Sequence, residues 1–455
     1  MRAREDLRIA IVGAGVSGLS FAWYLKQMGF SSVTFFEATG EVGGQSHTID
    51  IDGVPVEMGT CYLADGYVIA REIAHAAGCP PARLPPPTFL DANGRVVSPA
   101  MPTMGQAARY VWRWLGWYLG GQMWTPADPE NALGFVEWLD RKGLGDLASS
   151  IIFADGCTAQ LYGPLADITA HNGLIWVRPS LLLTGRREDT AHIPAGFQNM
   201  WRGLLRHLAY EVRADSRVVE VVAAGAPDAP GDAVTIVLAN GARERFDHAI
   251  VACPLDDAPG QGGEAVRHPL SGLLRASPPF DATLVYSAIW RGTNWPAAAP
   301  SRCYLPAASS GERGRLLTIR QFGRVGEDWV GQLCSYALDN AAPIDHDALL
   351  VNRDRVVADM TAIVGLRDVR IVHDRLWRYS IRYSAAQLRD GLPGRIAERQ
   401  GAGGVWYTGG ALSHWDVDTI ANFNQALAWR FATGAGVPLA TRLRIVRLRD
   451  LVRSL

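Results

Sequence analysis

Three glycines near the N-terminus, Gly13, Gly15 and Gly18, follow a short hydrophobic run and precede a stretch with helical periodicity. This spacing lets a chain turn tightly out of a strand, bring its backbone against a pyrophosphate and pack the next helix closely on a sheet. Glu37 ends a second hydrophobic run, where its carboxylate can accept both hydroxyls of an adenosine ribose. The pattern predicts a dinucleotide site with contacts from Gly13, Ala14, Gly15, Val16, Ser17, Gly18, Glu37 and Ala38.

A second glycine pair follows the predicted ribose acid, within the sequence Glu41-Val42-Gly43-Gly44-Gln45-Ser46. Two adjacent glycines let the main chain run flat beside a bulky cofactor, which favours a flavin over a nicotinamide. The alternative is an ordinary strand-to-helix turn, which would not require strand, glycines, helix, strand and acid in this order. We therefore expect further cofactor contacts from Gly43, Gly44, Gln45 and Ser46.

With these motifs, the chain resembles the FAD-dependent amine oxidase and phytoene desaturase superfamily over most of its length. Other FAD motifs of that superfamily are similar to residues 57–60, 193–200, 217–222, 246–254 and 406–410. The resemblance implies FAD as the cofactor. It also implies FAD contacts from Met58, Gly59, Thr60, Val219, Cys253, Gly409, Gly410, Asp418, Thr419 and Ile420.

Within the superfamily, the chain most resembles flavin-dependent polyunsaturated fatty-acid double-bond isomerases. It shares their Glu-Met-Gly turn, the Phe89-Leu90 region that ends at Gly94, and the spacing of Ser413 and Asp418. Where those isomerases hold a substrate carboxylate with an arginine, residues 85–87 of this chain are prolines. The resemblance therefore does not extend to that way of holding a free fatty acid.

The expected fold class is α/β. Because the FAD motifs are spread along the chain, we predict a discontinuous Rossmann-type, glutathione-reductase-like FAD-binding domain. Residues 61–189 and 265–385 are expected to form a mixed-sheet substrate-binding domain, since alternating hydrophobic runs in the second segment predict strands. The predicted boundaries are 1–60, 190–260 and 390–440 for the FAD domain, about 100–185 for a helical subdomain, and 441–455 for an amphipathic tail.

Composition narrows the function classes. The 455 residues are ample for several packed domains, and a net charge of −1 gives no electrostatic basis for binding nucleic acid. The first predicted strand starts too close to Met1 for a separate signal peptide, so we expect a cytoplasmic protein. The six cysteines lack any C-x-x-C pair or cysteine-histidine ligand spacing, so we predict no metal site.

Amine oxidation is disfavoured by what the chain lacks. In the amine oxidases of this superfamily a lysine holds a water beside the flavin, but Lys26 and Lys142, the two lysines here, lie in no matching motif. Residues 417–419 stand where an aromatic cage would precede the final helix. Residues 408–415 contain no cysteine for covalent attachment, so we predict non-covalent FAD. Gly410 also replaces an acidic residue usual in this motif.

Four residues are the candidate catalytic group: His414, Trp415 and Asp416, just before the final helix, and Tyr62, just after the Glu-Met-Gly turn. His414 and Asp416 are titratable groups suited to proton transfer or substrate anchoring. Aromatic residues suit the walls of a dry pocket but are equally compatible with core packing. The further candidates for such walls are Phe197, Tyr286, Tyr379 and Tyr383.

The alternative role for Asp416 is support of a helix cap. The final helix is expected from about Thr419, and Asp418 or Thr419 has a side chain suited to cap it. His171 and Arg178 have a possible place on the second-domain face, although we favour solvated loops for both.

An aromatic-rich segment at residues 108–124 holds four tryptophans and two tyrosines. It fits either a core helix of the second domain, which we favour, or a helix that rests on a membrane interface or lines an entry channel. It is too short in apolar residues to span a membrane. Expected partners are a hydrophobic small-molecule substrate and, through this segment, a peripheral membrane or carrier-protein contact.

The leading functional prediction is an FAD-dependent oxidoreductase that acts on C–H and C=C bonds of a polyene, polyketide or acyl-type substrate by hydride transfer to flavin N5. Internal return of the hydride would make it a double-bond isomerase, and loss of the hydride would make it a desaturase or oxidase. The alternatives are an amine or amino-acid oxidase, and a redox-inactive FAD-binding accessory protein of a biosynthetic pathway.

Overall fold

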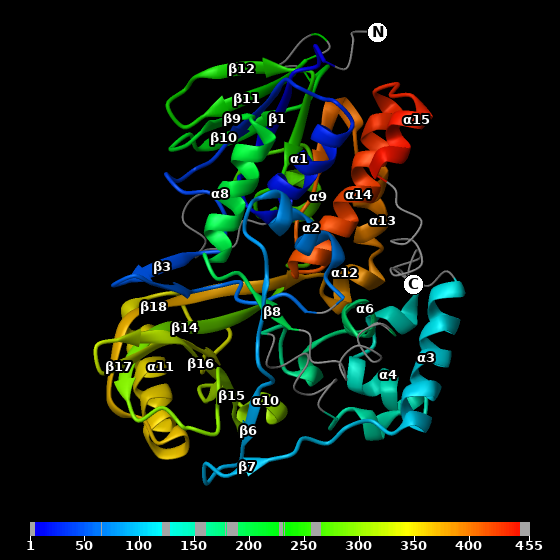
Figure 1. The fold of residues 1–455 in the computed structure, drawn as a ribbon. Coiled ribbons are helices and arrows are strands. Elements are labelled where there is room, and N and C mark those ends of the chain that lie inside the picture. The colour runs from blue at the N-terminus through cyan, green and yellow to red at the C-terminus, as the bar shows by residue number, and fades with distance from the viewer. Residues whose placement is uncertain are drawn as a thin grey trace.

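The computed structural model describes residues 5–64, 66–120, 128–150, 161–177, 179, 190–226, 231, 233–255 and 265–445. Figure 1 shows three regions: a sheet with its helices at the top, a second sheet with long strands at the lower left, and a group of helices at the lower right. Arg178, Cys157 and Trp124 lie outside the described residues.

A five-stranded parallel sheet in the order β19-β13-β1-β2-β9 forms the centre of the first region. Successive residues of a strand point to opposite faces. Ile9 and Ile11 therefore join one core cluster with helices, whereas Ala10 and Val12 join another beneath a three-stranded antiparallel sheet. The elements are β1 (Ile9–Val12), β2 (Val33–Phe36), β9 (Glu211–Arg213), β13 (His248–Val251) and β19 (Val405–Tyr407), the second-sheet strands β10 (Val218–Val222), β11 (Val234–Leu238) and β12 (Arg243–Phe246), and the helices α1 (Val16–Gln27), α8 (Phe197–Leu208) and α14 (Val417–Gly434).

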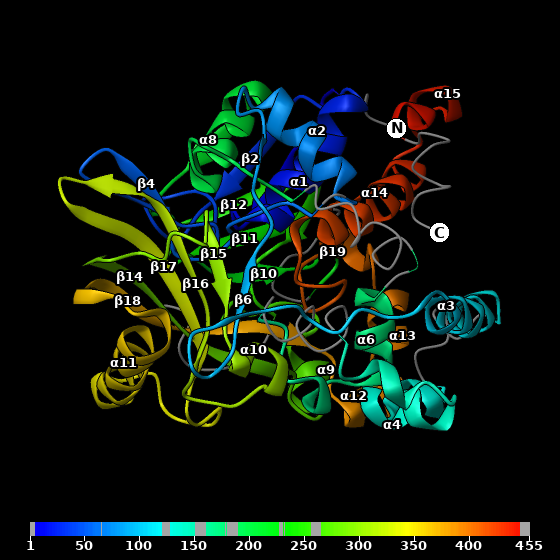
Figure 2. The same cartoon turned by 60° about the horizontal axis from the view of Figure 1, so that its bottom comes forward.

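The second region is a seven-stranded mixed sheet in the order β18-β14-β17-β16-β15-β6-β7, in which only the β15–β6 pair is parallel. One face is covered by α11, as both views show (Figure 1, Figure 2), and the other packs on the β3–β4 hairpin through Val285, Ile289 and Tyr379. The bounds are β3 (Thr48–Ile51), β4 (Val54–Glu57), β6 (Thr88–Leu90), β7 (Val96–Val97), β14 (Asp281–Thr293), β15 (Arg302–Tyr304), β16 (Leu316–Val325), β17 (Asp328–Tyr336), β18 (Arg367–Arg382) and α11 (His346–Asp359).

The third region is helical and explains most of the aromatic-rich segment. Its helix α3 (Met104–Leu119) packs with α4 (Phe135–Arg141) and α6 (Ala170–Trp176). Tyr110, Trp114 and Trp117 are buried in that core, and each donates a hydrogen bond, to the carbonyls of Val177 and Leu174 and to Asn131 Oδ1, respectively. Trp112 lies on the opposite face and is 74% exposed.

Several shorter elements connect these regions. Helix α2 (Val68–Ala76), inside the range predicted for the substrate-binding domain, packs on α8 and α14. The others are β5 (Ala82–Arg83), β8 (Ala191–His192), α9 (Ser271–Arg275), α10 (Pro306–Ser310), α12 (Ala385–Arg389), α13 (Leu392–Glu398) and α15 (Leu439–Arg442). Within the described parts of the chain, none of the helices combines the length and apolar character needed to cross a membrane.

Candidate active site

The first glycine turn is dictated by close backbone packing. Gly13 has φ +103°, and a Cβ atom there would lie 3.1 Å from the carbonyl oxygen of Ala252. At Gly18, a Cβ atom would lie 2.2 Å from the carbonyl oxygen of Gly13 and 2.9 Å from a methyl group of Ile11. Only glycine lets α1 approach the sheet this closely, as the sequence predicts.

The two glycine pairs meet to form one cradle. The amide of Gly43 donates to the carbonyl of Ala14 at 2.9 Å, and a Cβ atom on Gly15 would lie 3.6 Å from Gly44 Cα. Gly44 has φ +58°, which favours glycine. Residues Val16 and Ser17 begin α1, whose first turn has no acidic side chain, so its amides and dipole face this cradle without a carboxylate from the helix itself.

Glu37 stands beside the cradle at the end of β2. Its Oε2 accepts a hydrogen bond from the amide of Ala14 at 2.9 Å, and its Oε1 accepts from the amide and the hydroxyl of Thr39, each at 3.0 Å. Ala38 is the next residue of this bend. Bare glycine backbone, a helix N-terminus and a carboxylate placed for a ribose fit the adenosine and pyrophosphate parts of FAD.

The Glu-Met-Gly turn closes on the second glycine pair. A Cβ atom on Gly59 would lie 1.8 Å from the carbonyl oxygen of Gln45, and the hydroxyl of Ser46 donates to that of Thr60 at 3.0 Å. Met58 is buried in the cluster beneath the long-stranded sheet. The structure thus brings Gln45, Ser46, Met58, Gly59 and Thr60 together.

Glu57 and Gln198 hold this turn and were not among the predicted site residues. The Glu57 carboxyl accepts hydrogen bonds from the amide of Phe197 at 2.7 Å and the hydroxyl of Thr48 at 2.9 Å. Burial raises the pKa of Glu57 to about 8. Gln198 donates to the carbonyl of Val42 at 3.1 Å. Both lie in the motifs at 57–60 and 193–200, so their position in those motifs was the available signal.

The C-terminal motif is tied to the N-terminal one. Gly409 has φ +148°, and a Cβ atom on Gly410 would lie 3.3 Å from Trp415 Cα. Asn424, on α14, donates from Nδ2 to the carbonyl of Ser17 and to the hydroxyl of Ser20, both at 2.8 Å. The interior of α14 is therefore tied to the N-terminal part of α1.

The cap of α14 differs from the prediction. Asp416, not Asp418 or Thr419, is the N-cap residue, because its Oδ1 accepts from the amides of Asp418 at 3.0 Å and Thr419 at 2.9 Å. Asp418 instead accepts from the amide of Ala70 at 2.9 Å, and Ile420 is buried. The FAD contacts predicted for Asp418 and Thr419 would compete with this cap.

Of two further predicted FAD contacts, Cys253 lies next to Gly13 and Val219 lies on β10. The amide of Cys253 is within reach of Gly13, where a Cβ atom would lie 3.4 Å from it. Burial raises the pKa of the Cys253 thiol to about 12, so it is neutral at physiological pH. The carbonyl of Val219 accepts from the amide of Arg267 at 2.9 Å.

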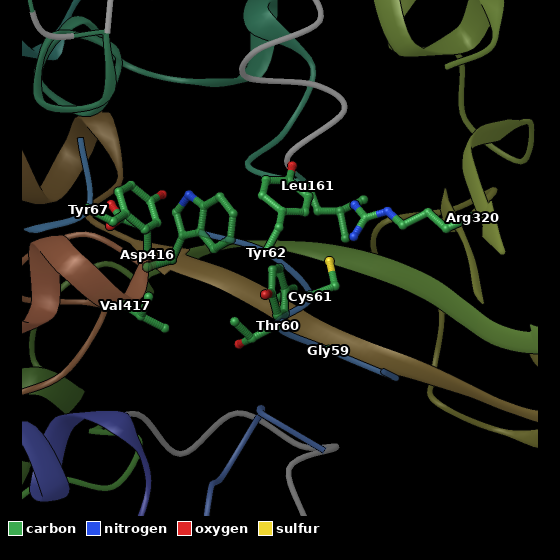
Figure 3. A pocket seen from close by; sticks show the side chains of 11 residues that line it. Gly59, Thr60, Cys61, Tyr62, Tyr67, Leu161, Arg320, Asp416 and Val417 are labelled. Carbon is green, nitrogen blue, oxygen red and sulfur yellow. The ribbon is translucent and has the colours of Figure 1, made fainter. Parts of the chain in front are cut away.

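A pocket opens beside the Glu-Met-Gly turn and the start of α14 (Figure 3). It encloses about 460 Å³ outside protein atoms, part of which is continuous with solvent. Its walls are largely aromatic, with one cation and one carboxyl. The lining residues are Gly59, Thr60, Cys61, Tyr62, Tyr67, Leu161, Arg320, Tyr379, Trp415, Asp416 and Val417.

Three of the four candidate catalytic residues, Tyr62, Trp415 and Asp416, line this pocket, and Tyr379 does so among the predicted wall residues. The other predicted wall residues, Phe197, Tyr286 and Tyr383, belong to three separate hydrophobic clusters. Sequence reasoning missed Arg320, whose signal was a charged residue directly after the mainly apolar residues 316–319 at the start of β16.

His414 lies behind the pocket wall. Its Nδ1 is 2.9 Å from Asp416 Oδ2, and its ring stacks on Trp176 with 5.3 Å between ring centroids. The prediction of a solvated loop for His171 is wrong, because it is buried in α6. Burial, with the charge of His414 as a smaller cause, lowers the pKa of His171 to about 4, which keeps its ring neutral at physiological pH.

The site and fold can now be compared with known proteins. The family model for flavin-containing amine oxidoreductases matches residues 16–387. The polyenoic fatty acid isomerase of Ptilota filicina is 24% identical over 237 residues, which cover 45% of this chain and 47% of that protein. Protoporphyrinogen oxidase 2 of Arabidopsis thaliana is 51% identical over 54 residues, 12% of this chain and 10% of that protein. The chain therefore spans less than half the length of these relatives.

Two solved structures share the fold. The CLA-producing fatty acid isomerase from P. acnes superposes with a TM-score of 0.73 at 20% identity, covering 95% of this chain and 100% of that chain. A wild-type putrescine oxidase bound to putrescine superposes with a TM-score of 0.66 at 15% identity, covering 94% and 99%. These likenesses confirm the predicted α/β fold, and the family confirms FAD as the cofactor. The protein belongs to the flavin-containing amine oxidoreductase family.

Proposed function

We propose that this flavin-dependent oxidoreductase acts on an unsaturated hydrophobic substrate and shifts its double bonds, with desaturation as the variant reaction. The aromatic wall formed by Tyr62, Tyr379 and Trp415 is the observation that carries the proposal. Flat apolar rings suit a conjugated or skipped polyene chain better than a polar metabolite. The isomerases among the similar proteins support the same choice.

The chain's own residues define what the site does. The aromatic rings exclude water and orient the hydrocarbon chain of the substrate. FAD, when bound, supplies a reversible hydride acceptor. An isomerisation moves one hydrogen within the substrate, so substrate and product have the same formula and no oxidant is consumed. Asp416 is committed to the helix cap and to His414, which favours an orienting role for it over free proton transfer.

The positions of the lysines support carbon chemistry over amine oxidation. Lys142 forms an ion pair with Glu130 at 2.8 Å in the helical region, and Lys26 lies at the end of α1, with its Nζ 5.2 Å from the centroid of the Tyr210 ring. Neither lysine lines the pocket. A lysine-dependent oxidase mechanism therefore has no lysine at this site.

The test is an anaerobic incubation of the purified holoenzyme with polyunsaturated fatty acids, carotenoid-type polyenes and polyamines, while flavin absorbance and product are followed together. We expect a conjugated isomer to accumulate while the flavin ends oxidised. Persistent bleaching by a polyene would establish desaturation instead. Bleaching by amines alone would overturn the proposal. A Lys142→Gln variant is a matched control, since it should leave the reaction unchanged.

A further inference from the structure

Two arginines lie side by side in the sheet next to the pocket. Arg302 on β15 and Arg320 on β16 are direct register partners, so their side chains share one face of the sheet. Their exposed fractions are 4% and 7%. Both guanidinium groups face the ring of Tyr62, with Cζ 5.4 Å and 4.5 Å from its centroid. Figure 3 shows the Arg320 side chain extending into the pocket beside Cys61 and Tyr62.

In the part of the chain that the structure describes, these two cations have no carboxylate counter-ion. Among the described residues, neither guanidinium lies within ion-pair distance of a carboxylate, and the Nε and Nη1 atoms of both are buried without a hydrogen-bond partner. Several nearby arginines do have ion-pair or hydrogen-bond partners, although the Nε atom of Arg382 is also buried without one. Arg315 and Arg353 form bidentate ion pairs with Asp359 and Asp374, and buried Arg382 donates to the carbonyls of Tyr162 and Ser380.

The groups around Arg320 do not supply the missing charge. Burial raises the pKa of the Cys61 thiol, raises that of Cys334 to about 12, and raises that of the Tyr62 phenol well above its usual value. Glu57, whose pKa burial raises to about 8, already binds Phe197 and Thr48. A guanidinium stays protonated at all physiological pH values. Two adjacent buried like charges without a partner are costly, which indicates an anionic ligand.

We propose that the pocket binds the carboxylate of its substrate, with Arg320 as the direct partner and Arg302 as the supporting cation. A carboxylate matches the planar fork of a guanidinium, which can bind it through two parallel hydrogen bonds. The apolar remainder of the substrate then lies against Tyr379 and Trp415. This inference rests on the proposed function for its choice of an unsaturated acid, whereas the carboxylate itself is argued from the two arginines.

Binding to the holoenzyme tests the proposal without requiring turnover. Linoleic acid and methyl linoleate share the same acyl chain, but the ester replaces the charged carboxylate with a neutral methyl ester. Both would be titrated while the flavin spectrum and tryptophan fluorescence are recorded. We expect the acid to bind at least tenfold more tightly than the ester. In Arg320→Met we expect the acid to lose about 10- to 100-fold in affinity, as for a lost charged hydrogen bond, while the ester is unaffected.

Control variants separate a binding role from a structural one. Arg324→Met changes an exposed arginine of the same strand and should leave both affinities unchanged. Arg320→Lys should restore part of the preference for the acid, because it keeps the charge but not the fork. Arg320→Met should also melt at a higher temperature than the wild type without ligand, since it removes an unpaired buried charge, and linoleic acid should no longer raise its melting temperature.

Failure of this inference differs from failure of the proposed function. Equal binding of acid and ester, or an acid preference that survives in Arg320→Met, would overturn the carboxylate site. A normal acid preference with no isomerised or desaturated product would leave the site standing and remove the proposed reaction. An aromatic amino acid that competes with linoleic acid and bleaches the flavin would likewise confirm the carboxylate site and assign the pocket to amino-acid oxidation.

Discussion

The protonation of Glu57, beside the cofactor cradle, makes the stability of the folded protein depend on pH. Burial raises the pKa of its carboxyl from 4.5 to about 8 in the folded protein, while two hydrogen bonds partly oppose the shift. Between these pH values the folded chain holds a proton that the unfolded chain releases. This contribution therefore makes the folded state less stable as pH rises through that window, and the loss levels off above about 8.

We predict that Glu57→Gln will flatten this pH dependence. The side-chain amide oxygen of the glutamine can still accept a hydrogen bond from the backbone amide of Phe197, so the fold is kept. The position then carries no titratable group. The drop in melting temperature between pH 5 and pH 8 should be smaller in the variant than in the wild type. Glu137→Gln, at an exposed ion pair with Arg141, is the control and should keep the wild-type slope. Equal slopes for wild type and Glu57→Gln would contradict the assignment.

Gly15→Val should leave a folded but colourless protein. A Cβ atom at Gly15 makes only ordinary contact at 3.6 Å, so the fold tolerates it, yet a branched side chain would occupy the cradle between the two glycine pairs. The measurements are the flavin-to-protein absorbance ratio and circular dichroism. Stoichiometric FAD in the folded variant would refute the role of the turn. Gly53→Val is a control for the effect of backbone strain alone. A valine is strained at φ +88°, but its Cβ atom would have no other group within 4 Å and so would not enter the cradle.

Acid precipitation tests how the flavin is attached. Because the stretch 408–415 holds no cysteine, we expect the flavin to appear in the supernatant. Yellow colour retained in the washed protein pellet would show a covalent bond.

The glycines and Glu37 could be picked out because they form a recognisable local pattern of strand, turn, helix and strand. Some contacts that require glycine, such as that of Gly13 with Ala252, nevertheless come from distant parts of the chain. Arg320 could not be predicted as a pocket residue. Its surroundings come from residues 61–62, 161 and 415–417, which the fold gathers from distant parts of the chain. Phe197, Tyr286 and Tyr383 show the same limit, since aromatic type alone does not distinguish a wall from a core.

At the scale of elements, α14 begins with a residue that serves both the helix and the site. Asp416 caps the helix through Oδ1 and contacts His414 through Oδ2. The sequence predicted the helix correctly but placed its start near Thr419, because Asp416, Asp418 and Thr419 all have side chains that can cap. What distinguishes Asp416 is its extended backbone and the two amides that its side chain accepts from, and both appear only in the folded structure.

Asp416→Ala should destabilise the protein by about 1 to 2 kcal/mol, the usual cost of a lost cap. Asp416→Asn should lose less than half as much, because its oxygen can still accept from the amides of Asp418 and Thr419. Unfolding in urea, followed by fluorescence and flavin release, measures both. Equal destabilisation by Ala and Asn would show that the contact with His414, and not the cap, dominates.

Helix α3 has two faces with different neighbours. Tyr110, Trp114 and Trp117 pack inward, whereas Met104, Trp112 and Leu119 are 70%, 74% and 76% exposed and fall on one stripe of the helix. The sequence could show the density of aromatic residues but not which face would meet the helical core. A membrane or carrier-protein contact through this segment stays a prediction. The surface available for such a contact is the exposed stripe.

At the scale of the whole molecule, α3 stands at the periphery in both views (Figure 1, Figure 2), so its exposed stripe is accessible. If the stripe rests on a membrane, the protein should co-sediment with anionic vesicles, because the exposed Arg113 lies on the same helix, next to Trp112 in sequence. Trp112→Gln should reduce the fraction of protein that co-sediments with the vesicles several-fold, without changing the flavin content. Co-sedimentation equal to the wild type would remove Trp112 from the contact, and none at all would favour a protein partner or no contact.

The α/β class and the split FAD domain could be inferred because FAD motifs recur at recognisable points along the chain. The mixed second sheet could be inferred from the alternating hydrophobic runs between those motifs. The domain boundaries stay predictions. Helix α2 illustrates why sequence is a poor guide to them: it lies between a cofactor motif and the substrate region, yet it packs on α8 and α14.

The bond between Asn424 and the first turn of α1 joins residues that are about 400 positions apart. Because synthesis runs from the N-terminus, the glycine turn is made about 400 residues before the helix that braces it. Strand β19, at the edge of the parallel sheet, is also completed only at Tyr407. A chain that stops before Tyr407 lacks both this edge strand and the helix that braces the glycine turn. Chains truncated before that point should therefore be recognisable by their lack of flavin colour.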